Sequence, residues 1–178
     1  MTAPLTVWTI GHSSRSIEDF LALVRSQAIE RIADIRRFPG SRAHPHFNPE
    51  PLAASLANAG IEYLPFPDLG GRRKARPDSP NTIWRNPSFR GYADYMSTPA
   101  FAEALDRFVE IARERRTALM CSEAVWWRCH RSMVADALKA CGIEVLHVMD
   151  GPKVVEHPYT SAARIDDGRL AYGADPGA

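Results

Sequence analysis

The feature that most constrains the fold is an alternation of short apolar runs with amphipathic stretches. The apolar runs occupy residues 5–10, 31–35, 61–66, 117–120 and 143–148. Turn residues follow each run, and the stretches between them carry apolar side chains at helical spacing. Strands that alternate with helices are typical of a mainly parallel sheet covered on both faces, with right-handed crossovers. The sequence therefore predicts an α/β fold with an open, Rossmann-like, three-layer arrangement.

Local signals predict where several helices begin and end. Ser16 opens a capping box before an amphipathic stretch. Asn48 followed by Pro49 predicts a second helix start, and Gly60 predicts its end. Thr98 is expected to cap a further helix, and residues 91–96 are expected to form a helical turn before it.

Length and composition indicate one domain, residues 1–178. The chain is 45% apolar, which suffices for a sizeable core. The formal charge of +1 excludes a global field that attracts polyanions, so an anion-binding surface has to be local. Three cysteines do not make a disulfide framework, and no apolar stretch is long enough to span a bilayer. A cytoplasmic protein without a membrane partner is expected.

Two segments lack a strand–helix pattern. Residues 67–90 are rich in proline and carry six Arg/Lys residues, with Trp84 and Phe89 among them. This mixture suits single-stranded nucleic acid, where phosphates meet cations and bases stack, or it is simply a solvated loop. In the tail, residues 151–178, Asp167 and Gly168 separate two short apolar runs and predict a small hairpin.

Polar residues follow the predicted strands and are expected to share the carboxyl edge of the sheet, where open α/β sheets bind ligands. These residues are Gly11, His12 and Ser13; Asp34 and Arg36; Cys121 and Glu123; and His147 with Asp150. His12 is a candidate general base or phosphate ligand, or a simply hydrogen-bonded turn residue. Asp34 and Arg36 form either a ligand clamp or an ion pair.

The turn after the fourth strand concentrates reactive side chains. If a helix begins near Arg128 or Cys129, its N–H groups favour an anion, and His130 and Arg131 stand beside it. Cys129 would then have a lowered pKa and be a possible nucleophile. Alternatively, Cys129 packs as a small apolar residue while Arg131 forms an ion pair with Glu123 or Asp34.

Cys121 allows a second interpretation of the same turn. Enzymes that use a thiolate hold an oxyanion with a cysteine after a strand, followed by a loop and an arginine. In this chain the loop has no glycine and contains an acidic residue and two tryptophans. Trp126 and Trp127 are either a base-stacking wall or a plug at the sheet edge. The alternative for Cys121 is the last buried residue of its strand. The cysteines, Glu123 and His130 have zinc chemistry, but their spacing does not favour a metal, and no cofactor is expected.

Several ordered motifs resemble those of the family called domain of unknown function 488, along nearly the whole chain. They are Thr9–Ser13, Asp34–Arg36 with Pro39 and Ser41, Leu69–Gly71, Gly91–Met96, Cys121–Glu123, Cys129–Arg131 and His157–Thr160. Ile35 stands where the family often has valine, and Ser122 where it often has alanine. The resemblance implies a compact α/β protein and attaches no reaction to it.

The residues themselves support three functional hypotheses. The first is a phosphate-recognising pocket for a nucleotide or nucleic-acid end, gripped by Arg36, Arg131 and residues 11–13, with residues 67–90 as a cover. If it is an enzyme, Glu123 or His12 is the general base. The second is a cysteine-dependent transferase or phosphatase using Cys121 or Cys129. The third is a non-enzymatic binding module.

Overall fold

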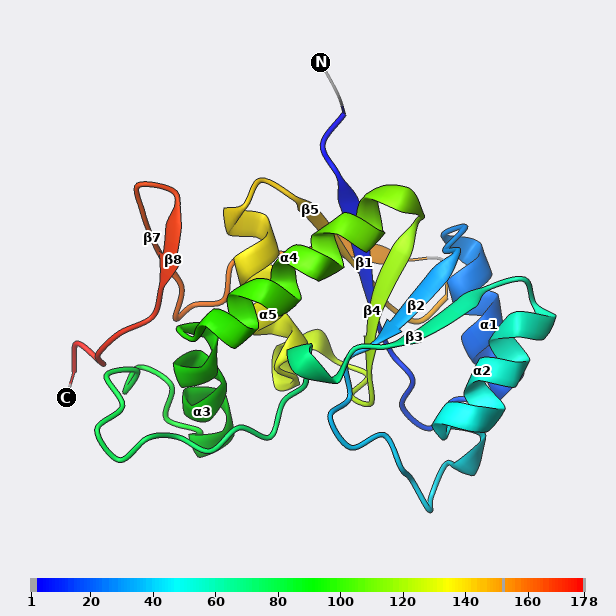
Figure 1. Ribbon diagram of the computed structural model, residues 1–178, viewed down its shortest axis with the longest axis horizontal. Helices are drawn as coiled ribbons and strands as arrows, with labels where there is room; N and C mark the ends of the chain where they lie inside the picture. Colours follow the sequence, from blue (N-terminus) through cyan, green and yellow to red (C-terminus); the bar gives the residue numbers. More distant parts are fainter. Residues whose placement is uncertain (1–2, 152, 178) are drawn as a thin grey trace.

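A six-stranded sheet forms the centre of the protein (Figure 1). The computed structural model describes residues 3–151 and 153–177. The strand order is β3-β2-β4-β1-β5-β6, with all neighbours parallel except the antiparallel pair of β5 and β6. The strands are β1 Thr6–Gly11, β2 Arg31–Asp34, β3 Glu62–Pro65, β4 Thr117–Cys121, β5 Glu144–Val148 and β6 Val154–Glu156. The mainly parallel sheet is confirmed; the short antiparallel edge strand β6 is an addition to it.

Helices cover both faces of this sheet, which confirms the three-layer α/β fold (Figure 1). The helices are α1 Ile17–Ser26, α2 Pro49–Asn58, α3 Pro87–Met96, α4 Pro99–Glu114 and α5 Arg131–Ala140. α1 and α2 pack on one face, and α4 and α5 pack on the other, with α3 extending the second layer. In the described part of the chain, no helix combines the length and apolar character needed to cross a bilayer.

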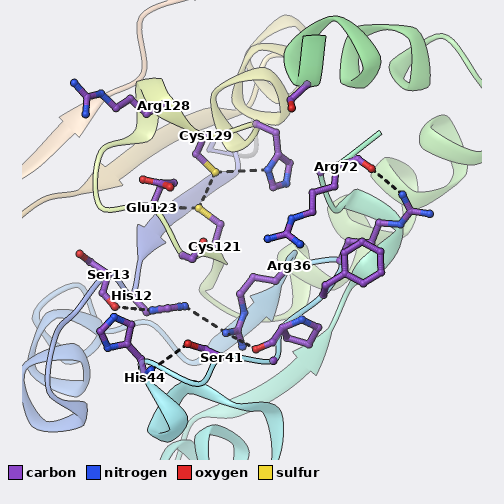
Figure 2. A pocket seen from close by; sticks show the side chains of 18 of the residues that line it. His12, Ser13, Arg36, Ser41, His44, Arg72, Cys121, Glu123, Arg128 and Cys129 are labelled. Carbon is purple, nitrogen blue, oxygen red and sulfur yellow. Dashed lines mark hydrogen bonds between the residues drawn. The ribbon is translucent and has the colours of Figure 1, made fainter. Parts of the chain in front are cut away.

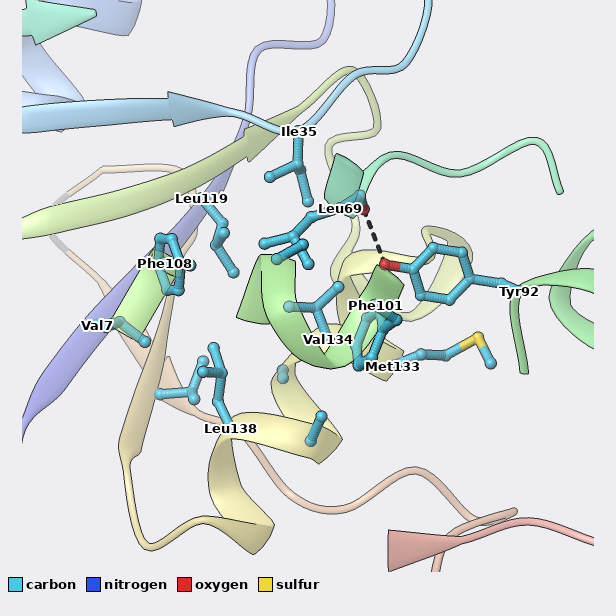
Figure 3. Close-up of a cluster of buried hydrophobic side chains, with 14 of the residues drawn as sticks. Val7, Ile35, Leu69, Tyr92, Phe101, Phe108, Leu119, Met133, Val134 and Leu138 are labelled. Carbon is cyan, nitrogen blue, oxygen red and sulfur yellow. Dashed lines mark hydrogen bonds between the residues drawn. The ribbon is translucent and has the colours of Figure 1, made fainter. Parts of the chain in front are cut away.

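The alternating side chains of the strands feed two separate cores. Val7 in β1 and Leu119 in β4 face α4 and α5, where Phe108 and Leu138 bury them (Figure 3). Trp8 belongs to the opposite cluster, under α1 and α2. Because successive side chains of a strand point to opposite faces, strands covered on both sides need apolar residues at nearly every position. That requirement explains the continuous apolar runs in the sequence.

The predicted helix boundaries are largely confirmed. The Ser16 side chain accepts a hydrogen bond from the Asp19 N–H, and Thr98 caps α4. Pro49 begins α2, and Gly60 after it adopts a φ of 76°. The helical turn predicted at 91–96 is present as part of a longer helix, since α3 begins at Pro87 and has ten residues.

The predicted C-terminal hairpin is also present. It consists of β7 Arg164–Asp166 and β8 Arg169–Ala171, paired antiparallel. Asp167 and Gly168 between them have φ values of 47° and 73°. A two-residue hairpin turn with both residues in the left-handed region matches the strand twist, which explains the Asp-Gly pair.

The segment 67–90 is irregular but tightly held. The carboxylate of Asp94 in α3 accepts hydrogen bonds from the Arg76 N–H, the Ser79 hydroxyl and the Asn81 amide. Trp84 packs edge-on against Phe89 and Tyr172, with its indole nitrogen buried. Trp84 is therefore half-buried against the core, with its ring already packed on two aromatic neighbours, and the expectation that it stacks on nucleic-acid bases stays a prediction.

The chain reverses its direction across the sheet between β1 and β4, which are neighbours. From β1 the chain crosses through α1 to β2, towards the β3 edge, whereas from β4 it crosses through α5 to β5, towards the β6 edge. Such a reversal leaves a crevice beyond the carboxyl ends of the two strands, which is the usual ligand site of an open α/β sheet.

Gly11 at the end of β1 allows the backbone of the loop after β4 to approach closely. A Cβ at this position would lie 1.6 Å from the Glu123 carbonyl oxygen, whereas nothing lies within 4 Å of a Cβ at Gly40. We expect Gly11→Ala to lower the free energy of unfolding by about 1–3 kcal/mol, because overpacking shifts backbone. Gly40→Ala is the control, and urea unfolding measures both. Equal stability of the two variants would contradict the close approach.

Candidate functional site

A cavity of about 640 Å³ opens at this reversal point (Figure 2). The ends of β1 and β4, the loop after β2, the loop before α5 and the segment 67–90 all contribute to its wall. Its lining includes His12, Ser13, Ser14, Arg36, Arg37, Phe38, Ser41, His44, Gly71, Arg72, Ser88, Phe89, Cys121, Ser122, Glu123, Arg128, Cys129 and His130. The predicted convergence of the post-strand segments therefore occurs, with one exception: Asp150 binds Arg15 and His147 lies buried within β5.

Positive charge dominates the cavity wall. Four arginines line it, at positions 36, 37, 72 and 128, against one acidic side chain, Glu123. Among the residues that the structure describes, neither Arg72 nor Arg128 forms a salt bridge. Guanidinium groups suit phosphate and carboxylate, so the cavity favours an anionic ligand.

Arg36 is held in place by Asp34, the residue with which the sequence pairs it. The Asp34 carboxylate accepts from Arg36 Nε at 2.9 Å and from Nη2 at 2.7 Å. The Tyr63 hydroxyl also donates to Asp34, at 2.6 Å. Asp34 lies behind the cavity wall, whereas Arg36 is part of it. The pair is thus an ion pair that presents a rigid arginine to the cavity.

An exposed aromatic ring stands at the edge of the cavity. Phe38 is 58% exposed, and the guanidinium groups of Arg37 and Arg72 lie 5.2 Å and 5.7 Å from its ring centroid. The ring and the two guanidinium groups therefore place an apolar surface and positive charge side by side at the cavity edge.

Cys121, the last residue of β4, has its sulfur at the floor of the cavity. Cys129 Sγ lies 2.8 Å from Cys121 Sγ, and Arg131 Nη1 donates to the same sulfur at 2.6 Å. Burial alone would raise the pKa of this thiol. The hydrogen bond from Cys129 and the charge of Arg131 outweigh burial and lower the pKa to about 6. Cys121 is therefore mainly a thiolate at neutral pH.

Arg131 differs from the expected ligand grip. Its side chain is fully buried, and the guanidinium points into the sheet, towards Cys121 and Thr9. It also donates to the carbonyl oxygens of Glu123 and Ala124. These partners occupy the Arg131 guanidinium, and it does not line the cavity. The alternative ion pair between Arg131 and the carboxylate of Asp34 or Glu123 does not form either, and Asp34 pairs with Arg36 instead. Arg131 instead fixes the loop around the Cys121 sulfur.

Cys129 also differs from expectation, because α5 begins at Arg131 rather than at Arg128 or Cys129. Residues 126–128 form a separate 3-10 turn, and Cys129 has an extended backbone with φ −129° and ψ 147°. This conformation interrupts the helix and directs the Cys129 sulfur to Cys121. Burial, and then the contact with Cys121, raise the pKa of Cys129 well above its usual value. Of the two thiols in contact, Cys121 thus has the lowered pKa and Cys129 the raised pKa.

His12 and His130, the two histidines predicted in the site, are both neutral. His12 already has hydrogen-bond partners, and His130 is enclosed. Burial lowers the pKa of His12 to about 4; its Nδ1 pairs with the Ser13 carbonyl, and Nε2 lies 3.3 Å from Arg36 Nη1. Burial and the charge of Arg131 also lower the pKa of His130 to about 4. Because Arg36 occupies the free nitrogen of His12, Glu123 is the better-placed candidate for moving protons.

Eight of the eleven predicted site residues line the cavity, and Gly11, Asp34 and Arg131 support it from behind. Sequence reasoning missed Arg37, Phe38, Ser41 and His44 as members of the wall, and it placed Arg72 there only as part of the cover expected from residues 67–90. Arg37 and Phe38 directly follow Arg36 after the second strand, and that position was an available signal. Within the described part of the chain, no three His, Cys, Asp or Glu side chains gather closely enough to hold a metal ion.

Fold and cavity define an α/β protein with a cavity at the reversal point of a mainly parallel sheet. The family model described as Domain of unknown function DUF488 matches residues 16–138, and the chain belongs to this family. No curated protein and no solved structure matches the chain. The matched segment contains Arg36, Arg72, Cys121 and Arg128, so most of the cavity wall lies within it.

Proposed function

We propose that the protein is a cysteine-dependent enzyme, a phosphatase or group transferase, that acts on a phosphate-bearing small molecule such as a nucleotide. The observation that carries this proposal is the position of Cys121: its sulfur lies at the floor of an arginine-lined cavity, hydrogen-bonded by Arg131 and Cys129. A thiolate is a strong nucleophile, and the Arg131 guanidinium offsets the cost of burying its charge.

The wall of the cavity supports the choice of substrate class. Arg72 and Arg128 offer positive charge, and Ser13, Ser41 and Ser122 offer hydroxyl groups. Phe38 adds a flat apolar surface beside two guanidinium groups. Phosphate binds the cations and hydroxyls, while a base can stack on the ring.

The proposed reaction has two balanced steps. The Cys121 thiolate attacks phosphorus, so that an S–P bond forms while the P–O bond to the leaving group breaks, and the leaving oxygen takes up a proton. Water or an acceptor alcohol then attacks the phosphorus, loses a proton and releases the thiolate. Among the described residues of the cavity wall, Glu123 is the carboxyl group available to carry these protons.

Protection of Cys121 from alkylation tests this proposal without a known substrate. Iodoacetamide should modify Cys121 first, and inorganic phosphate or AMP should slow that modification by filling the cavity. In the double variant Arg72→Gln/Arg128→Gln, the anion concentration needed for half-protection should rise at least about tenfold, since a hydrogen bond to a charged group contributes about 1.5–3 kcal/mol.

Arg113→Gln is the matched control, because Arg113 is an exposed arginine of α4 outside the cavity. It should leave half-protection unchanged. Better protection by AMP than by phosphate would support a nucleotide and a role for Phe38. Rapid alkylation of Cys121 that neither anion slows would contradict the substrate class, whereas slow alkylation of Cys121 would contradict the nucleophile.

A further inference from the structure

Behind the Cys121 site, a line of buried polar side chains runs through the layer between the sheet and α5. It starts at Arg131, which donates from Nη1 to the Cys121 sulfur and from Nε to Thr9 Oγ1 at 3.3 Å. Thr9 in β1 is fully buried, and its Oγ1 lies 2.5 Å from His147 Nδ1 in β5. One guanidinium therefore connects the reactive sulfur to a buried threonine and a buried histidine.

The line continues from His147 to a carboxylate. His147 Nε2 lies 2.8 Å from His157 Nδ1, and His157 Nε2 lies 2.8 Å from Asp136 Oδ1. The Thr160 hydroxyl and the Tyr172 hydroxyl donate to the other oxygen of Asp136. The motif at residues 157–160 does not line the cavity. Its first and last residues, His157 and Thr160, both contact Asp136 instead.

The groups at the two ends of this line, Arg131 and Asp136, determine which group donates in every hydrogen bond between them. A guanidinium can only donate and a carboxylate can only accept. Arg131 therefore donates to Thr9, and Thr9 donates to His147. His147 then donates from Nε2 to His157, and His157 donates to Asp136. Each neutral group accepts once and donates once, so the line is fully satisfied without further partners.

Trp126 covers the line from the loop that carries Cys129. Its ring stacks on His147 with a centroid distance of 4.6 Å and an interplanar angle of 3°, and meets His157 edge-on at 5.2 Å. Burial, and the neighbouring imidazole, lower the pKa of His147 to about 2, so this ring stays neutral. A neutral His147 is what allows Thr9 to donate to it and to remain an acceptor for Arg131.

We propose that Asp136, His157, His147 and Thr9 form a positioning network that holds the Arg131 guanidinium against the Cys121 sulfur and so maintains the thiolate. None of the four lines the cavity, and each acts through the next. The inference rests on the proposed function, in which Cys121 is the nucleophile, and it adds residues 9, 136, 147 and 157, none of which lines the cavity.

Thr9→Val tests the network, because valine keeps the shape and removes the hydroxyl that joins Arg131 to His147. The pKa of Cys121, read from the pH dependence of iodoacetamide alkylation, should rise by about 1 unit, as expected when an opposite charge is held less closely. Thr9→Ser should restore the wild-type profile. The charged and titratable groups around the sulfur are unchanged in both variants: Arg131, Cys129, His130, His12, Arg36, Glu123 and Arg128.

Thr117→Val is the matched control for buried polarity. Thr117 in β4 is also fully buried, and its hydroxyl donates to the Arg115 carbonyl at the other end of the strand. It should lower the melting temperature without moving the Cys121 profile. His157→Asn, a second variant further along the line, should raise the Cys121 pKa in the same direction by a smaller amount.

The outcomes separate the network from the proposed function. A low Cys121 pKa in wild type that Thr9→Val and His157→Asn leave in place would overturn the network and keep the nucleophile. A wild-type Cys121 pKa near that of an ordinary thiol would overturn the proposed function itself. A rise in Thr9→Val that Thr117→Val reproduces would make the effect one of general stability and would also overturn the network.

Discussion

Cys121→Ser is expected to abolish the rapid alkylation of the protein and to reduce any turnover by at least about 1,000-fold, as loss of a catalytic nucleophile does. Of the three cysteines, Cys121 alone has a lowered pKa; burial raises the pKa of both Cys129 and Cys141. Peptide mapping after brief exposure to iodoacetamide at pH 7 should therefore find one modified cysteine, Cys121.

The pH dependence of this reaction has a definite sign. The thiolate reacts and the thiol does not, and the Cys121 pKa is about 6. The alkylation rate should be nearly constant from pH 7 to 8.5 and should fall about tenfold for each pH unit below 6. An ordinary thiol would instead show a rate that still rises between pH 7 and 8.5.

Cys141→Ser is the matched control, because Cys141 follows α5 and lies outside the cavity. It should leave the fast phase intact. A fast phase that survives in Cys121→Ser and disappears in Cys129→Ser would reverse the roles of the two thiols. That result would return the site to the interpretation in which Cys129 is the nucleophile.

The sequence predicts much of this architecture because local signals determine it. Continuous apolar runs require strands buried on both faces, and Asp167-Gly168 requires a hairpin turn. Once the strands are parallel, the segments after them share one edge, which explains why Cys121, Arg36 and His12 meet in one cavity. No structural detail is needed for that step.

The parts that the sequence could not predict depend on side-chain direction and on distant partners. Arg131 lies in the predicted motif, but its guanidinium faces Thr9 and Cys121 instead of the cavity, and no local pattern predicts that α5 begins at Arg131 after an extended Cys129. Arg72 reaches the cavity from an irregular segment without periodicity. The connection of Asp136 to His157 joins α5 to the tail, and no local pattern encodes such a pairing.

Arg131→Met should lower the free energy of unfolding by about 3–5 kcal/mol, the usual effect of removing one partner from a buried charged pair. Methionine fills the volume of the stem but leaves the Cys121 sulfur and the carbonyl oxygens of Glu123 and Ala124 without their donor. The exposed Arg115, which pairs with Glu62 at 3.5 Å, is the control; Arg115→Met should cost less than about 1 kcal/mol.

The stability deficit of Arg131→Met should also depend on pH. The Cys121 pKa in the folded wild type is lowered from 9.0 to about 6, so the thiolate contributes stability that is fully present above the unfolded pKa and is lost as pH falls through 6. Without Arg131 this contribution disappears. Urea unfolding at pH 6 and pH 8.5 should therefore show a deficit that is larger at pH 8.5, and the second change Cys121→Ala should reduce that difference. A deficit that is equal at both pH values would mean that Arg131 holds the loop carbonyls but does not stabilise the thiolate.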